Sequence, residues 1–157
     1  TEAELEFEFV ADEGATVPAN LNLADGFTVY EAVLREVWDE EASSLNGIIG
    51  IILVGSPRIQ ELNREYLGKD QPTDVLSFDL SDDADSFEGE VYIGVDHAAA
   101  QAEDIGCSLA EEIARLMIHG VLHLAGHDHS EPDDERRMLE ATDVWIERWR
   151  VASGNPA

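Results

Sequence analysis

Apolar and polar positions along the chain follow two periods, which together predict four strands and five helices. Strict alternation is typical of a half-buried strand, and a run of aliphatic residues is typical of a strand buried on both faces. Apolar positions three or four residues apart predict an amphipathic helix. The predicted strands are residues 4–10, 48–54, 73–80 and 89–95, and the predicted helices are residues 28–41, 56–68, 96–106, 108–126 and a last helix that Pro132 opens.

Capping residues mark the ends of these helices. Residue types that cap helix N-termini stand at the start of four of them, at Thr28, Ser56, Asp96 and Ser108. Three glycines are placed as helix stops, at Gly68, Gly106 and Gly126. The element order β-α-β-α-β-β-α-α-α predicts an α/β (α+β) fold, a small mixed four-stranded sheet flanked by helices. No linker or repeat divides the chain, so we expect a single domain over residues 1–157.

The charge of the chain is strongly acidic. Asp and Glu number 35 against 9 Lys and Arg, for a net charge of -26, and Lys69 is the only lysine. One interpretation is an acidic surface that binds cations or basic partners. The interpretation we favour is adaptation to a salt-rich cytoplasm, where screening makes such self-repulsion tolerable.

The cysteine content and hydropathy predict a cytoplasmic protein with no membrane partner. Cys107 is the only cysteine, so the chain forms no internal disulfide, as is usual in a reducing compartment. No apolar stretch approaches the roughly 20 residues that span a bilayer. The acidic start of the sequence also lacks the basic and apolar regions of a signal peptide.

Candidate chemistry is concentrated in the histidines of residues 119–129. His119 and His123 are four residues apart on a predicted core helix, so their imidazoles project from the same face. Gly126 ends that helix, and His129 follows as a third ligand from outside it. Three protein ligands leave one position for water, which is the pattern of a catalytic zinc site. The sequence therefore predicts one Zn²⁺ ion at the end of a core helix, although imidazole also suits nickel or copper.

Two other histidines are interpreted as structural, and one glycine separates this site from the zinc proteases. His127 is placed on the surface, and His97 lies at a predicted helix start. The extended zinc-protease pattern H-E-x-x-H-x-x-G-x-x-H matches at every histidine and at its glycine. Gly120 stands where that pattern has the glutamate that acts as general base, which weakens the peptidase interpretation.

At these residues the chain resembles the YbeY family of bacterial endoribonucleases. Residues 119–129 match a signature that looks like H-G-x-L-H-L-x-G-[YH]-D-H. A second block, residues 62–66 with Asp70 and residues 72–78, also agrees, as do residues 89–94. The resemblance covers roughly residues 45 to 150 in the right order.

The resemblance implies a zinc-dependent hydrolase, a single-strand-specific endoribonuclease of ribosome biogenesis. Members mature the 3′ end of small-subunit rRNA and act in ribosome quality control. The implied partners are therefore single-stranded RNA, small-subunit rRNA, and the ribosome or its proteins. The family's zinc ligands map onto His119, His123 and His129.

The catalytic groups beyond the zinc-bound water are not identified by the sequence. Many family members carry an arginine where this chain has Leu67, so either Lys69, Arg64 or another positive group replaces it, or the active site works differently here. Asp128 is interpreted as a partner that orients a ligand imidazole, with general base as the alternative. Ser77, like Asp74 in the same matched block, either lines the cleft or makes turn and strand-end hydrogen bonds.

Two alternative functions stay open. One is a zinc hydrolase of another class, such as a peptidase, and the other is a non-catalytic ribosome-assembly factor with a structural metal. The acidic charge also leaves the mode of RNA binding open, because RNA-binding proteins normally carry a basic surface. Four arginines on the last predicted helix form either a basic patch or ion pairs with nearby carboxylates; they are Arg136, Arg137, Arg148 and Arg150.

Overall fold

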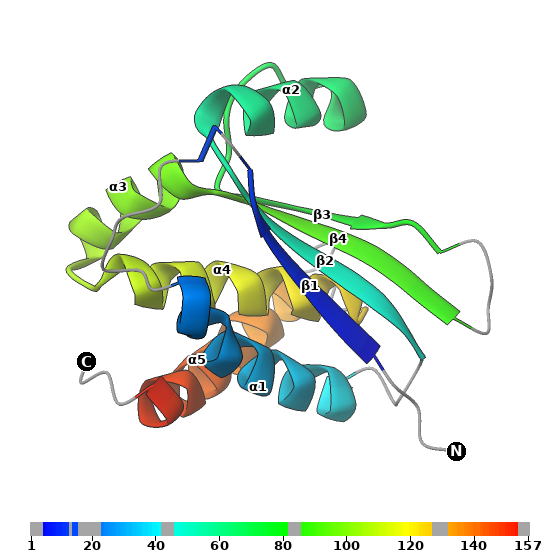
Figure 1. Cartoon of the computed structure of the whole chain (residues 1–157), viewed down its shortest axis with the longest axis vertical. Helices are drawn as coiled ribbons and strands as arrows, with labels where there is room; N and C mark the ends of the chain where they lie inside the picture. The colour runs from blue at the N-terminus through cyan, green and yellow to red at the C-terminus, as the bar shows by residue number, and fades with distance from the viewer. Residues whose placement is uncertain are drawn as a thin grey trace.

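Four strands form one mixed sheet in the order β1-β2-β4-β3 (Figure 1). The computed structural model describes residues 5–12, 14–15, 23–41, 46–81, 86–126 and 132–153. Three strands run parallel, and they are β1 (Leu5–Ala11), β2 (Asn46–Val54) and β4 (Ser86–Gly94). The edge strand β3 (Val75–Asp79) pairs antiparallel with β4. The sheet is therefore mixed and four-stranded, as predicted.

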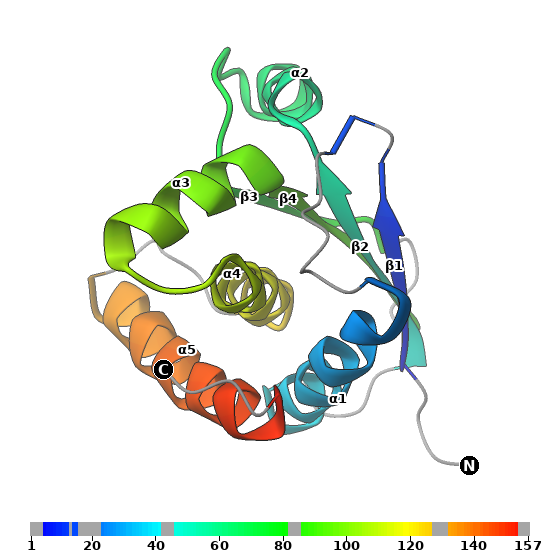
Figure 2. The same ribbon diagram turned by 60° about the vertical axis from the view of Figure 1, so that its left-hand side comes forward.

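Helices cover both faces of this sheet. They are α1 (Leu23–Glu41), α2 (Ser56–Leu67), α3 (Val95–Ile105), α4 (Leu109–Leu124) and α5 (Pro132–Ser153). Figure 1 shows α2 on one side of the sheet and α1, α4 and α5 on the other. Figure 2 looks nearly along α4, which lies between the sheet and the layer formed by α1 and α5, with α3 beside it.

The helix α4 is buried on almost every side. Its side chains pack against inward-facing strand residues such as Ile49 and Val91, both with no exposed surface, and against Trp145 of α5. A smaller apolar cluster lies beneath α2, where Ile59 and Leu62 pack on the opposite face of the sheet. A helix that is apolar nearly all round belongs in the interior, so α4 is the core helix of the fold.

Several predicted helix ends are confirmed. Gly68 follows α2 in the left-handed conformation at φ 71°, which glycine adopts without steric cost. Gly106 ends α3 in the same way. The Ser108 hydroxyl accepts a hydrogen bond from the backbone N–H of Glu111 at 3.1 Å, which caps α4.

Four predicted boundaries were wrong. The first helix begins at Leu23 instead of at Thr28, and its helical backbone continues through Gly26, a residue with poor helix propensity. The strand β4 begins at Ser86 instead of Gly89, because it pairs with β2 along its whole length.

The caps of α2 and α3 were also misassigned. Ser56 is the first helical residue of α2, and Gly55 precedes it as the N-cap without a side-chain bond. The Asp96 carboxylate accepts hydrogen bonds from the Ser56 backbone N–H at 3.2 Å and hydroxyl at 2.9 Å. Asp96 therefore caps α2, although it lies in the first turn of α3. Among the residues described, no helix is long and apolar enough to cross a membrane.

Candidate functional site

Two of the predicted zinc ligands project from the C-terminal half of α4. His119 and His123 are four residues apart on this helix, so their side chains lie on the same face, one turn from each other. His119 is half-buried and His123 is exposed, so both imidazoles are accessible from outside the core. Their burial differs from that of Ile118 and Leu122 on the same helix, which are fully enclosed.

Gly120 faces the sheet. A Cβ atom at this position would lie 2.5 Å from Val91 Cγ1 and 3.1 Å from Ser77 Oγ. The Ser77 hydroxyl donates a hydrogen bond to the Gly120 carbonyl at 3.4 Å. A glutamate here would meet the sheet instead of standing beside the two histidines. Packing thus explains why the zinc-protease glutamate has no counterpart in this chain, and it places Ser77 behind the histidine face of α4.

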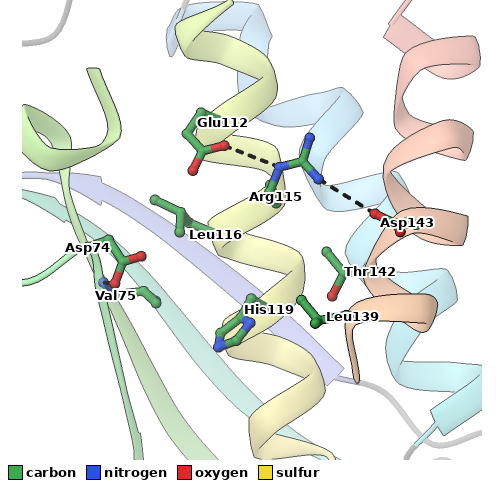
Figure 3. A pocket seen from close by; sticks show the side chains of 9 residues that line it. All are labelled: Asp74, Val75, Glu112, Arg115, Leu116, His119, Leu139, Thr142 and Asp143. Carbon is green, nitrogen blue, oxygen red and sulfur yellow. Dashed lines mark hydrogen bonds and ion pairs between the residues drawn. The ribbon is translucent and has the colours of Figure 1, made fainter. Parts of the chain in front are cut away.

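A cavity of about 200 Å³ opens beside His119 (Figure 3). It lies between α4, the start of β3 and α5. Its walls bring together the histidine helix and the sequence block around Asp74, which are far apart along the chain. The residues that line it are Asp74, Val75, Glu112, Arg115, Leu116, His119, Leu139, Thr142 and Asp143.

Asp74 lines this cavity and is also held by hydrogen bonds at the strand end. Its Oδ1 accepts from the backbone N–H of Val75 at 2.8 Å, and its Oδ2 accepts from the Gln101 side chain at 3.2 Å. Asp74 therefore has both of the roles considered from the sequence, lining the cleft and making hydrogen bonds at the strand end. The carboxylate is fixed in place from β3 and from α3.

Glu112 is a buried carboxylate in the wall of the same cavity, with 2% of its surface exposed. Its Oε1 accepts a hydrogen bond from Arg115 Nε at 3.2 Å. Burial raises the pKa of Glu112, and nearby Asp74 raises it further, while Arg115 acts in the opposite direction. Figure 3 shows Arg115 between Glu112 and Asp143, whose carboxylate lies 3.9 Å from Arg115 Nη1.

Glu111, the neighbouring residue, has the opposite pKa shift. Arg150 of α5 binds it with two hydrogen bonds, Nε to Oε1 at 2.8 Å and Nη2 to Oε2 at 3.1 Å. These bonds from Arg150 lower the pKa of Glu111, which is 4% exposed. This ion pair joins α5 to the start of α4.

The remaining predicted site residues lie elsewhere. Lys69 is exposed in the loop after α2, and Leu67 is exposed at the end of that helix. Neither lines the cavity with His119. His127, Asp128 and His129 lie outside the described residues. Within the described ranges no three His, Cys, Asp or Glu side chains form a metal site, so the predicted zinc ligation stays a prediction.

Several residues of the cavity were not predicted from the sequence, namely Glu112, Arg115, Thr142 and Asp143. A signal for the first of these was present. Glu112 precedes His119 by seven residues, which is two helical turns and therefore the same face of α4. Nothing in the local sequence indicates that α5 brings Thr142 and Asp143 to this face.

The arginines of α5 form ion pairs with carboxylates. Arg136 pairs with Asp133 on the same helix, and Arg148 reaches Glu36 of α1 at 3.4 Å. Arg150 binds Glu111 and Glu147. For these three arginines the structure therefore favours the ion-pair interpretation over a free basic patch.

Comparison with solved structures places the fold among known proteins. A protein of Thermotoga maritima, whose structure was determined in solution, superimposes with a TM-score of 0.66 at 27% sequence identity. The match covers 96% of this chain and 93% of that one. The mixed sheet and its helices are therefore shared over nearly the full length of both proteins.

Comparison of sequences identifies the family. The family model described as Endoribonuclease YbeY matches residues 19–150. A protein of that name from Carboxydothermus hydrogenoformans is 46% identical over 125 residues, 76% of this chain and 87% of the relative. Another from Bacillus licheniformis is 35% identical over 154 residues, 91% of this chain and 94% of the relative. The chain belongs to the Endoribonuclease YbeY family, as the sequence motifs indicated.

Proposed function

We propose that this chain is a zinc-dependent endoribonuclease that cleaves single-stranded RNA. Its proposed role is maturation of the 3′ end of small-subunit rRNA, together with ribosome quality control, in the cytoplasm. The main observation in support is the accessible histidine pair of α4, of which His119 lines a cavity, in a chain of the Endoribonuclease YbeY family. Relatives named as endoribonucleases match most of the chain.

The residues present fit a zinc site. His119 and His123 offer two imidazoles one turn apart, and imidazole nitrogen is a preferred zinc ligand. Gly126, at φ 110°, adopts a backbone conformation that favours glycine, and it ends the helical segment ahead of His129. His129 is the proposed third ligand. Zinc held there would act as a Lewis acid for the phosphate and lower the pKa of a water molecule.

The side chains around the cavity would position the RNA. They offer little positive charge that is not already neutralised by a carboxylate. Among the described residues, Arg115 is the only arginine or lysine that lines the cavity, and its guanidinium faces three carboxylates, those of Glu111, Glu112 and Asp143. Positive charge near the phosphate would then come chiefly from the metal. This is consistent with Leu67 in place of the arginine common in the family. We expect the ribosomal setting, more than a basic surface, to bring RNA to this site.

A cleavage assay tests the proposal. The substrates are a single-stranded RNA, the same RNA in a duplex, and casein, each with and without a chelator. We expect cleavage of the single strand alone, loss of cleavage with chelator or His119→Ala, and faster cleavage with Leu67→Arg. The Leu67 side chain is 55% exposed, so the arginine fits without repacking.

Each other outcome points to an alternative. Chelator-sensitive digestion of casein without RNA cleavage would indicate a peptidase. Metal binding without cleavage of either substrate would indicate a ribosome-assembly factor with a structural metal. RNA cleavage that survives both the chelator and His119→Ala would contradict the proposed site.

A further inference from the structure

We propose that the cavity beside His119 is a nucleobase-binding subsite that selects guanine next to the cleaved phosphate. The inference rests on the proposed RNA cleavage and adds a base preference to it. The carboxylates of Asp74 and Glu112 would accept hydrogen bonds from the base edge (Figure 3).

The shape of the cavity suits one heterocycle. Pockets for drug-sized ligands measure roughly 300–1,000 Å³, and this one measures about 200 Å³. Three apolar side chains, Val75, Leu116 and Leu139, form part of its wall. Leu116 is buried and Leu139 is 58% exposed, so the apolar surface runs from the interior toward solvent. A flat base could enter past Leu139 and shed water from its faces.

The polar groups of the cavity are mainly hydrogen-bond acceptors. Oε1 of Glu112 accepts from Arg115, and within the part of the chain that the structure describes no donor reaches Oε2. Arg115 is occupied by the three carboxylates named above, and the Thr142 hydroxyl donates to the Met138 carbonyl at 2.7 Å. A ligand that offers donors would therefore complete the hydrogen bonding of this wall.

Guanine matches this arrangement best among the parts of RNA. Its N1–H and N2 amino group are adjacent donors, and a carboxylate accepts two such bonds side by side. Uracil presents one N–H between two carbonyl oxygens, which Glu112 would repel. A phosphate would be repelled as well, because, among the described residues, three carboxylates, those of Asp74, Glu112 and Asp143, line the cavity with a single arginine. The neutral base is therefore the part of the nucleotide that fits here.

The test compares guanosine with inosine, which lacks only the N2 amino group. Binding to the protein as purified is followed by NMR titration at pH 8. We expect guanosine to bind about tenfold more tightly than inosine, and we expect Glu112→Gln to abolish the difference. Glu103→Gln makes the same charge change at an exposed position of α3. This control variant should keep the difference in affinity between guanosine and inosine.

A second variant covers the case in which Glu112→Gln fails to fold. Leu139 is mostly exposed, so Leu139→Trp should leave the fold intact while its ring fills the mouth of the cavity. We expect this variant to lose guanosine binding. In RNA cleavage, its preference for guanosine over inosine at the cleaved position should fall by about tenfold.

The outcomes separate this inference from the proposed function. RNA cleavage with equal use of guanosine and inosine would overturn the subsite and leave the nuclease standing. Selective guanosine binding without RNA cleavage would support the subsite and count against the nuclease. Equal binding of all nucleosides would also overturn the guanine subsite. Binding of arginine amide in place of nucleosides would overturn it as well and would indicate a pocket for a basic protein side chain.

Discussion

Gly120 is the residue that separates the two chemistries that the histidine motif allows, peptide hydrolysis by the zinc-protease route and RNA cleavage. The position lies against Val91 of β4, with no room for a side chain. A carboxylate built here would be forced into the apolar interior against Val91, and burying a charge is costly. The histidines one residue before and three residues after it stay accessible. The helix therefore presents ligands on one side and requires a glycine on the other.

A substitution at Gly120 tests this close packing. Alanine gains about 1 kcal/mol of helix propensity over glycine, but overpacking a core costs about 1–3 kcal/mol. We expect Gly120→Ala to lower the free energy of unfolding by about 1 kcal/mol in chemical denaturation. In a Val91→Ala background the same change should raise it, because the clash is removed. A stabilising effect of Gly120→Ala in the wild-type background would contradict the packing described.

For single residues, the sequence predicted the common face of the two α4 histidines but not the side chains that surround them. The spacing of His119 and His123 was sufficient to predict that their side chains share one face of the helix, because residues four apart on a helix lie on a common face. The sequence left Asp74 open between a cleft position and strand-end hydrogen bonding, and the structure places it in the cavity with His119 and gives it both roles. Glu112 was missed although its spacing from His119 puts it on the same face of α4, and Thr142 and Asp143 were missed because no local pattern predicts that α5 closes the cavity. The arrangement of residues 127–131 and the metal itself stay predictions.

At the scale of elements, α5 is fastened to α4 by one buried ion pair. Arg150 holds Glu111 through two hydrogen bonds, at 2.8 and 3.1 Å, and the Glu111 side chain is 5% exposed. Most other ion pairs of the described chain are exposed, such as Arg136 with Asp133. Exposed pairs contribute little to stability, whereas removing one partner of a buried pair leaves an uncompensated charge. Of the ion pairs that join α5 to other helices, the pair of Arg150 with Glu111 should therefore contribute most to stability.

The pKa shift of Glu111 gives this pair a pH dependence. Its pKa is lowered from 4.5 in the folded protein by the hydrogen bonds from Arg150. The stabilisation is thus complete above pH 4.5 and is lost as the pH falls through the lowered value. We expect Arg150→Gln to cost about 2 kcal/mol of unfolding free energy at pH 7. The cost should shrink as the pH drops below 4.5, in urea denaturation at a series of pH values.

Arg136→Gln is the matched control, because it makes the same charge change in an exposed pair. It should cost no more than about 0.5 kcal/mol at any pH. Glu112, whose pKa is raised, is present in all these proteins, so its opposing contribution cancels in the comparison. An Arg150→Gln cost at pH 7 that is no larger than the cost of Arg136→Gln would show that the ion pair does not stabilise the fold.

Element types were predictable from periodicity, whereas several element ends were not. The alternation and the aliphatic run identified all four strands, since side-chain burial follows the period of two. The first residue of α2 was misassigned because its cap comes from Asp96, forty residues later in the sequence. A capping residue can serve a neighbouring helix as well as its own, and only the tertiary structure decides which.

At the scale of the whole molecule, the net charge of -26 predicts a dependence on salt. Self-repulsion among 35 acidic residues opposes the compact state, and salt shortens the range of that repulsion. We expect the melting temperature to rise between 0.1 M and 2 M potassium chloride. Most of the rise should come from screening, so sorbitol at equal osmolality should give a smaller increase. A melting temperature that is highest in low salt would contradict adaptation to a salt-rich environment.

The proposed activity depends on a metal centre on α4 that uses His123 as a ligand. The most direct test is the zinc content per folded chain, measured by elemental analysis after purification in the absence of chelator. Wild type is compared with His123→Ala and with His97→Ala, a control on α3. We predict about one zinc ion per chain in wild type and in the control, and none in His123→Ala. Zinc retained in His123→Ala at the wild-type ratio would contradict the claim.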